Sequence, residues 1–147
     1  MEIRLATVDD APIVAEFNIA MALETEDLRL DQETVNLGVN HLIQHEELGF
    51  YLVAVREGKV VGSLLVTTEW SDWRNGVFWW IQSVYVHPSF RRQGIYRSLY
   101  EHVRNLASSR NVCGFRLYVE KENRAAQQTY EKLGMHETHY QMYEQKP

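Results

Sequence analysis

Four consecutive residues, Arg91-Arg92-Gln93-Gly94, form the part of this chain that is best suited to bind an anion. They follow an apolar run at residues 79–86 that is typical of a buried strand, and Pro88 ends that run because proline cannot donate to a strand ladder. A helix is predicted from about Ile95, where apolar residues recur at helical spacing. A strand, a basic loop with a glycine and a helix N-terminus direct several backbone N–H groups toward one point, which favours a phosphate. An ordinary turn can have the same composition, so the loop alone does not decide between a phosphate site and a simple turn.

Two further candidate sites are less complete. His41 and His45 stand one turn apart in a predicted helix, a spacing that suits a metal, but the sequence offers no evident third ligand and we predict no metal site. Cys113 is the single cysteine, which excludes an intramolecular disulfide and favours a reducing, cytoplasmic location. We interpret Cys113 as a buried core thiol rather than a nucleophile.

Length and composition indicate one globular domain, which we place at residues 2–147. Its hydrophobic fraction of 45% and charged fraction of 24% are ordinary for a folded protein. No apolar run approaches the roughly 20 residues of a membrane span, and the N-terminal residues do not resemble a signal peptide. The formal net charge of −5 argues against general affinity for nucleic acid. We therefore expect neither a membrane nor a nucleic acid as partner.

The predicted elements alternate between strands and helices in the order β-α-α-β-β-β-α-β-α-β. The predicted strands are residues 2–6, 50–56, 60–68, 79–86, 113–120 and 136–144, and the predicted helices begin near residues 12, 31, 95 and 123. Residues 69–76 are predicted to form a polar, aromatic loop. The order predicts a mixed α/β (α+β) fold around one largely antiparallel sheet. Strands 79–86 and 113–120 are joined through a helix, so we expect them to be parallel neighbours.

Two motifs in this order resemble those of the GNAT N-acetyltransferases. Residues 91–96 resemble the family's pyrophosphate loop, (Gln/Arg)-x-x-Gly-x-(Gly/Ala), with Arg91 at the first position and Gly94 at the fourth. Tyr96 departs from the sixth position, where the family usually has a small residue. Residues 119–135 resemble the closing signature, which has an Asn at a strand end, an Ala one turn on, a Tyr, and then Gly before an apolar residue. The resemblance covers nearly the full chain and implies the GNAT acyl-CoA N-acyltransferase fold.

The resemblance also implies a binding site for acetyl-CoA, which would be a cosubstrate held where the two parallel strands splay apart. Backbone groups of Val84 and Val86, on either side of Tyr85, would pair with the pantetheine arm. The pyrophosphate would lie on backbone N–H groups, with help from the side chains of Arg92 and Arg97; those N–H groups belong to Arg92, Gln93, Gly94, Ile95, Tyr96 and Arg97. Asn123 would hydrogen-bond the pantetheine or phosphate region, although an Asn at this place can equally cap its helix.

Tyr130 corresponds to the family's general acid. A phenol with a pKa of about 10 can protonate the thiolate that acyl transfer expels, or donate a hydrogen bond to it. The alternative is a tyrosine that packs on its helix with its hydroxyl satisfied elsewhere. A backbone N–H near Val84 is the candidate donor to the oxyanion of the tetrahedral intermediate.

The general base is less well defined by the sequence. An acceptor amine with a pKa of about 10 arrives protonated and must lose that proton before it attacks. Some family members carry a glutamate on the central strand, but residues 79–83 contain no carboxylate. Glu24 and Glu26 are expected between the first two helices, in a segment that walls the acceptor groove in the family, so they are the candidate bases. Glu69, at the end of the third predicted strand, is a further carboxylate. Each is otherwise a solvated surface carboxylate, and a water relay is an equal alternative.

Four tryptophans gather near the predicted loop: Trp70, Trp73, Trp79 and Trp80. They either form an aromatic pocket for a cationic acceptor or, as we favour, build the core and a dimer contact. From sequence we therefore predict an N-acetyltransferase that acts on a primary amine of a small molecule or a peptide, with a homodimer left open. The alternative is a GNAT-fold module that binds acyl-CoA as a sensor or scaffold with little or no turnover.

Overall fold

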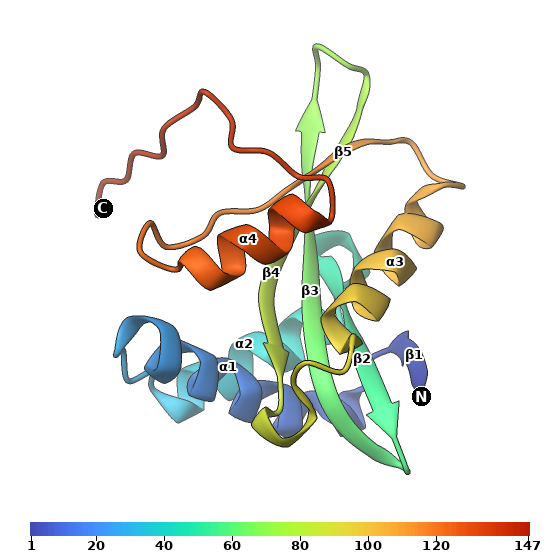
Figure 1. Ribbon diagram of the computed structural model, residues 1–147, viewed down its shortest axis with the longest axis vertical. Coiled ribbons are helices and arrows are strands. Elements are labelled where there is room, and N and C mark those ends of the chain that lie inside the picture. Colours follow the sequence, from blue (N-terminus) through green and yellow to red (C-terminus); the bar gives the residue numbers. More distant parts are fainter.

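The computed structural model describes residues 1–147 and has one five-stranded sheet covered by helices on both faces (Figure 1). The strands are β1 (Glu2–Leu5), β2 (Gly49–Arg56), β3 (Lys59–Ser71), β4 (Gly76–Val86) and β5 (Val112–Arg116). The helices are α1 (Ala11–Glu26), α2 (Gln32–Ile43), α3 (Ile95–Ala107) and α4 (Arg124–Lys132). The strand order is β1-β2-β3-β4-β5, and only the β4–β5 pair is parallel. The predicted mixed α/β fold and the predicted parallel pair are both confirmed.

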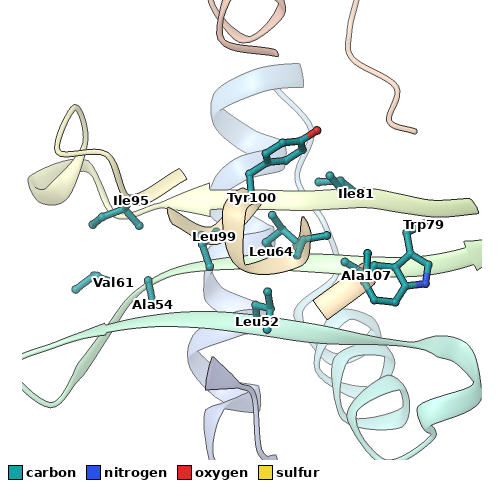
Figure 2. Close-up of a cluster of buried hydrophobic side chains, with 12 residues drawn as sticks. Leu52, Ala54, Val61, Leu64, Trp79, Ile81, Ile95, Leu99, Tyr100 and Ala107 are labelled. Carbon is teal, nitrogen blue, oxygen red and sulfur yellow. The ribbon is translucent and has the colours of Figure 1, made fainter. Parts of the chain in front are cut away.

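Alternation along β2 explains why helices cover both faces of the sheet. Successive side chains of a strand point to opposite faces, and Leu52 and Ala54 join the core under α3, while Tyr51 and Val53 join the core under α1 and α2. Figure 2 shows the first of these cores, in which Leu99 of α3 packs onto the sheet. The two faces therefore hold α3 on one side and the α1–α2 pair on the other, with β4 between them.

A β-bulge in β4 positions the candidate site. Ser63 of β3 pairs with Tyr85 and Leu65 pairs with Gln82, so the two residues between them on β4 oppose a single residue of β3. Ser83 has a φ of 49°, a left-handed conformation that non-glycine residues seldom adopt outside turns and bulges. Pairing between β4 and β5 has already ended at Trp80, before the bulge. The two strands diverge beyond that residue and leave a gap between them.

Several predicted boundaries are wrong, each for a local reason. The predicted loop 69–76 is shortened to a turn at residues 72–75, because Ser71 pairs with Gly76 and closes a long hairpin that projects beyond the other strands in Figure 1. β5 ends at Arg116 rather than at residue 120, because β4 has turned away and no ladder remains for residues 117–120. The predicted strand 136–144 is not formed; the chain after α4 joins no sheet.

One expectation about burial is also wrong, and another is met only in part. Cys113 is exposed rather than a core thiol, since β5 is an edge strand. Of the four tryptophans only Trp79 is buried in the core, whereas Trp70 and Trp73 near the hairpin tip are 59% and 84% exposed. The dimer contact expected of the remaining rings stays a prediction. No helix combines the length and the apolar character that crossing a membrane requires.

Candidate active site

A cleft of about 940 Å³ opens where β4 and β5 diverge. Its walls are β4 from Ile81 onward, the loop before α3, the first turn of α3, residues 118–120, α4 and the end of α1. The predicted site residues that line it are Glu24, Glu26, Val84, Tyr85, Val86, Arg91, Arg92, Gly94, Ile95, Tyr96, Arg97, Asn123 and Tyr130. Gln93 is not among the lining residues; its side chain instead hydrogen-bonds Arg56. The sequence motifs, which are far apart in the chain, therefore meet around one hollow.

The loop before α3 presents a row of free backbone donors. The N–H groups of residues 92–97 donate to no acceptor within the protein, and the first backbone bond of α3 runs from Ser98 N to Gly94 O at 3.0 Å. Gly94 is the N-cap residue with a φ of 78°, and a Cβ built on it would meet no atom within 4 Å. Free N–H groups at a helix N-terminus, in open space, attract an anion.

The arginines of this loop have different surroundings. Arg91 donates from Nε to the Val86 carbonyl at 2.8 Å and pairs with Glu24 at 2.8 Å. Arg97 pairs with Glu101, one turn further along α3, at 3.0 Å. Arg92 is exposed, has a positive φ of 62° and makes no ion pair, so its charge is the one free to meet an anion at the loop.

Tyr130 projects from α4 into the cleft with a half-buried side chain. Its hydroxyl makes no hydrogen bond within the protein and still reaches solvent, so the predicted alternative of a satisfied, packed hydroxyl does not apply. Burial raises the pKa of Tyr130, which keeps this phenol protonated at neutral pH. The arrangement provides a proton donor inside the cleft.

Asn123 is the N-cap of α4, and its Oδ1 accepts a hydrogen bond from the N–H of Ala126 at 3.2 Å. The capping role considered from sequence is therefore present. The amide nitrogen of the same side chain remains available to the cleft, which Asn123 also lines.

The end of α1 contributes carboxylates to the other side of the cleft. α1 extends through Glu26, so Glu24 and Glu26 lie on a helix and not in a loop between helices. Glu24 accepts from the Tyr85 hydroxyl at 3.1 Å in addition to its ion pair with Arg91. Burial, and then the hydrogen bond to Glu24, raise the pKa of Tyr85. Glu26 makes no ion pair or hydrogen bond through its side chain.

The cluster of Glu24, Tyr85 and Arg91 was not found by sequence reasoning. Its members are separated by as many as 67 residues, so no local pattern indicates that they meet. The histidine pair, by contrast, lies outside the cleft on α2. The rings of His41 and His45 stack with centroids 4.0 Å apart, and His45 Nδ1 lies 2.7 Å from the His41 carbonyl. No group of three or more His, Cys, Asp or Glu in the structure is placed to hold a metal ion.

The family model described as "Acetyltransferase (GNAT) family" matches residues 16–135. The chain belongs to the GNAT acetyltransferase family. A "possible acetyltransferase" from Clostridium difficile 630 is 47% identical, with a TM-score of 0.94 over 99% of this chain and 97% of that one. The likeness extends to more distant structures. A predicted acetyltransferase with acetyl-CoA from Clostridium acetobutylicum is 17% identical, with a TM-score of 0.80 over 98% of this chain and 95% of that one. A ribosomal-protein-alanine N-acetyltransferase from Brucella melitensis is 18% identical, with a TM-score of 0.79 over 99% of this chain and 97% of that one. At such identities the likeness shows the fold alone.

A comparison with curated proteins finds no match. The GNAT family nevertheless identifies this chain as an acyltransferase.

Proposed function

We propose that this GNAT protein transfers the acetyl group of acetyl-CoA directly to a primary amine of a small molecule or a peptide. The observation that carries the proposal is the position of an unbonded phenol, Tyr130, in the same cleft as a row of free N–H groups at residues 92–97. The first can protonate a leaving group and the second can bind a diphosphate. Acetyl-CoA carries a thiolate leaving group at one end of its pantetheine arm and a diphosphate at the other.

The donor substrate would be held mainly by the backbone. The pyrophosphate accepts hydrogen bonds from the N–H groups of residues 92–97, and the free guanidinium of Arg92 adds charge. The pantetheine arm lies along Val84 and Val86, on the edge of β4 that β5 leaves unpaired. Because the Val86 carbonyl already accepts from Arg91, its second lone pair is the one that remains for the substrate.

The transfer itself uses two groups of the protein. The amine nitrogen attacks the thioester carbonyl, and a backbone N–H at the bulge near Val84 stabilises the oxyanion that forms. The C–S bond then breaks with its electron pair on sulfur, and Tyr130 gives its proton to that sulfur. The nitrogen, which carries one proton too many after its attack, releases that proton to water as the amide forms. Holding the amine beside the thioester supplies a further part of the rate.

The amine must first reach the cleft and lose a proton. Glu24 and Glu26 line the cleft together with Glu120, and a cationic amine is attracted to such a wall. Glu24 already accepts from two neighbours, whereas Glu26 has none. We therefore propose that Glu26, directly or through a water, takes the amine proton, and that Glu24 holds the ammonium before it is deprotonated.

Calorimetry with CoA and acetyl-CoA, followed by thiol release against polyamines, amino acids, aminoglycosides and peptides, tests the proposal. Tight binding with amine-dependent thiol release is the expected result, and the amine that works names the acceptor class. Tight binding with no release for any amine would favour an acyl-CoA sensor instead. Absence of binding would refute the role given to residues 92–97.

A further inference from the structure

Tyr96 occupies the place where the family motif usually has a small residue, and its side chain packs inside the molecule. Its ring lies between two other tyrosine rings, with centroids 6.4 Å from Tyr100 and 5.8 Å from Tyr130. Tyr96 also lines the cleft that Tyr130 lines. Tyr96 is thus a wall residue of the candidate active site to which the motif assigns no side-chain function.

The hydroxyl of Tyr96 is buried and has no hydrogen-bond partner. Buried polar atoms without a partner are rare, because each has given up its hydrogen bonds to water without a replacement. The hydroxyl of Tyr130 is the other phenol of the cleft, and it too lacks a partner within the protein. The two rings are neighbours, but the two hydroxyls do not bond each other in this structure. A movement that follows ionisation of Tyr130 would bring its oxygen within reach of the Tyr96 hydroxyl as an acceptor.

We infer that Tyr96 positions Tyr130, by donating a hydrogen bond to the Tyr130 oxygen when Tyr130 gives its proton to the departing thiolate. The inference rests on the proposed function, in which Tyr130 is the general acid. When the C–S bond breaks, its electron pair goes to sulfur and the Tyr130 proton follows. The phenolate oxygen that remains on Tyr130 is the acceptor that Tyr96 lacks at rest. Tyr96 keeps its own proton throughout, and water later restores the proton on Tyr130.

The electrostatics of the pair give each phenol a distinct role. Burial raises the pKa of Tyr96, and the nearby charge of an ionised Tyr130 raises it further, so Tyr130 is the first of the two to ionise. Burial also raises the pKa of Tyr130. That rise opposes proton transfer to a thiolate, since an ordinary thiol has a pKa of about 8.5. A donor to the Tyr130 oxygen counteracts the effect of burial, because it stabilises the ionised form.

Other titratable groups near the pair are Tyr100, Arg104, Arg97, Arg92, Glu120 and Lys132. Arg104 acts on Tyr100, and Arg97 is paired with Glu101. None of them shifts the pKa of Tyr130, which burial alone perturbs. Geometry, and not these shifts, points to Tyr96: its ring centroid lies 5.8 Å from that of Tyr130, and its buried hydroxyl lacks an acceptor.

Tyr96→Phe tests the inference, because it removes the hydroxyl and keeps the ring. The pKa of Tyr130 would be measured by NMR on protein labelled at the tyrosine ζ carbon, with the Tyr130 signal assigned by its absence in Tyr130→Phe. We expect Tyr96→Phe to raise the pKa of Tyr130 and to lower kcat by about tenfold or more, the loss typical of a hydrogen bond to a charged group. Acetyl-CoA affinity should stay within about twofold of the wild type, because the Tyr96 side chain makes no contact with the pyrophosphate in this scheme. Tyr100→Phe, which removes the hydroxyl of the adjacent ring on the same helix, should leave both the pKa of Tyr130 and kcat unchanged.

A double-mutant cycle separates positioning from an independent effect. If Tyr96 acts through Tyr130, then Tyr96→Phe has no further effect on kcat in a Tyr130→Phe background. An unchanged pKa of Tyr130 in Tyr96→Phe, or the same fold loss in both backgrounds, would overturn the inference. A wild-type protein that transfers acetyl to no amine would refute the proposed function, and the NMR titration would still decide whether Tyr96 donates to Tyr130.

Discussion

Replacing Gly94 with alanine should weaken CoA binding far more than it destabilises the fold. Gly94 has a φ of 78°, and a Cβ built there would meet no protein atom within 4 Å. The stability cost of alanine is therefore that of a left-handed residue alone, about 1–2 kcal/mol. For a chain of this length that cost lowers Tm by roughly 3 °C per kcal/mol.

The effect on binding has a different origin. Alanine relaxes toward a right-handed conformation, and this rotates the peptide groups that aim the N–H groups of residues 92–97 at one point. Each hydrogen bond lost to a charged phosphate is worth about 1.5–3 kcal/mol, so losing one weakens CoA binding by roughly 10- to 150-fold.

Gly58 provides a matched control. It lies in the turn between β2 and β3 with a φ of 74°, and a Cβ there also meets nothing within 4 Å. Gly58→Ala and Gly94→Ala should lower Tm by similar amounts, while calorimetry with CoA separates them. S-acetylpantetheine lacks the pyrophosphate. With it as the acetyl donor, the wild type and Gly94→Ala should therefore have similar values of kcat/KM. Equal CoA affinity in wild type and Gly94→Ala would refute the pyrophosphate site, and an equal loss in Gly58→Ala would show that the effect is global.

Three other substitutions test separate parts of the structure. Tyr130→Phe should lower kcat by about 10²-fold or more and leave the CoA dissociation constant unchanged, because the hydroxyl acts on the leaving thiolate. Thiol-release kinetics measure kcat, and calorimetry measures the dissociation constant. Asp10→Asn should lower the free energy of unfolding by about 2 kcal/mol at pH 7, because Asp10 accepts from Arg4 at 2.7 Å and is nearly buried. The hydrogen bond from Arg4 holds the pKa of Asp10 below its ordinary value, so this stabilisation is present above about pH 4 and is lost as the pH falls through the native pKa. Gly114→Ala should lower the free energy of unfolding by about 1–3 kcal/mol, since the new Cβ would lie 2.7 Å from the Phe78 ring, and urea denaturation measures it.

Each of these substitutions has a control on the same molecule. Tyr143→Phe removes a hydroxyl that is on a residue 89% exposed and should leave kcat unchanged; a comparable loss there would discredit the assignment of Tyr130. Wild type and Asp10→Asn should converge in stability as the pH falls below the lowered native pKa of Asp10, and a constant difference across pH would contradict the ionic origin of the effect. Gly38 lies within α2 with no atom within 4 Å of a built Cβ, so Gly38→Ala should stabilise by up to about 1 kcal/mol.

The sequence predicted what depends on local spacing. Gly94 and the apolar residues of α3 lie within one strand–loop–helix unit, so periodicity and turn chemistry were enough to place them. Tyr130 and Asn123 were found through the resemblance to a family and not through periodicity. The bulge at Ser83 was missed because it depends on how β4 aligns with β3, and a strand pattern carries no record of its partner's register. The predicted strand 136–144 failed for a related reason: strand-like composition does not supply a partner.

Arg91 shows that a match to a motif does not tell what the side chain contacts. It holds the first position of the loop motif, yet its guanidinium contacts the Val86 carbonyl and Glu24. Glu24 in turn accepts from Tyr85, so the end of α1 is bonded both to β4 and to the loop before α3. A substitution of Glu24 would therefore disturb the position of that loop as well as the acceptor side of the cleft. A loss of activity in Glu24→Gln does not by itself identify a general base, whereas Glu26, which has no such bonds, can be tested for that role without moving the loop.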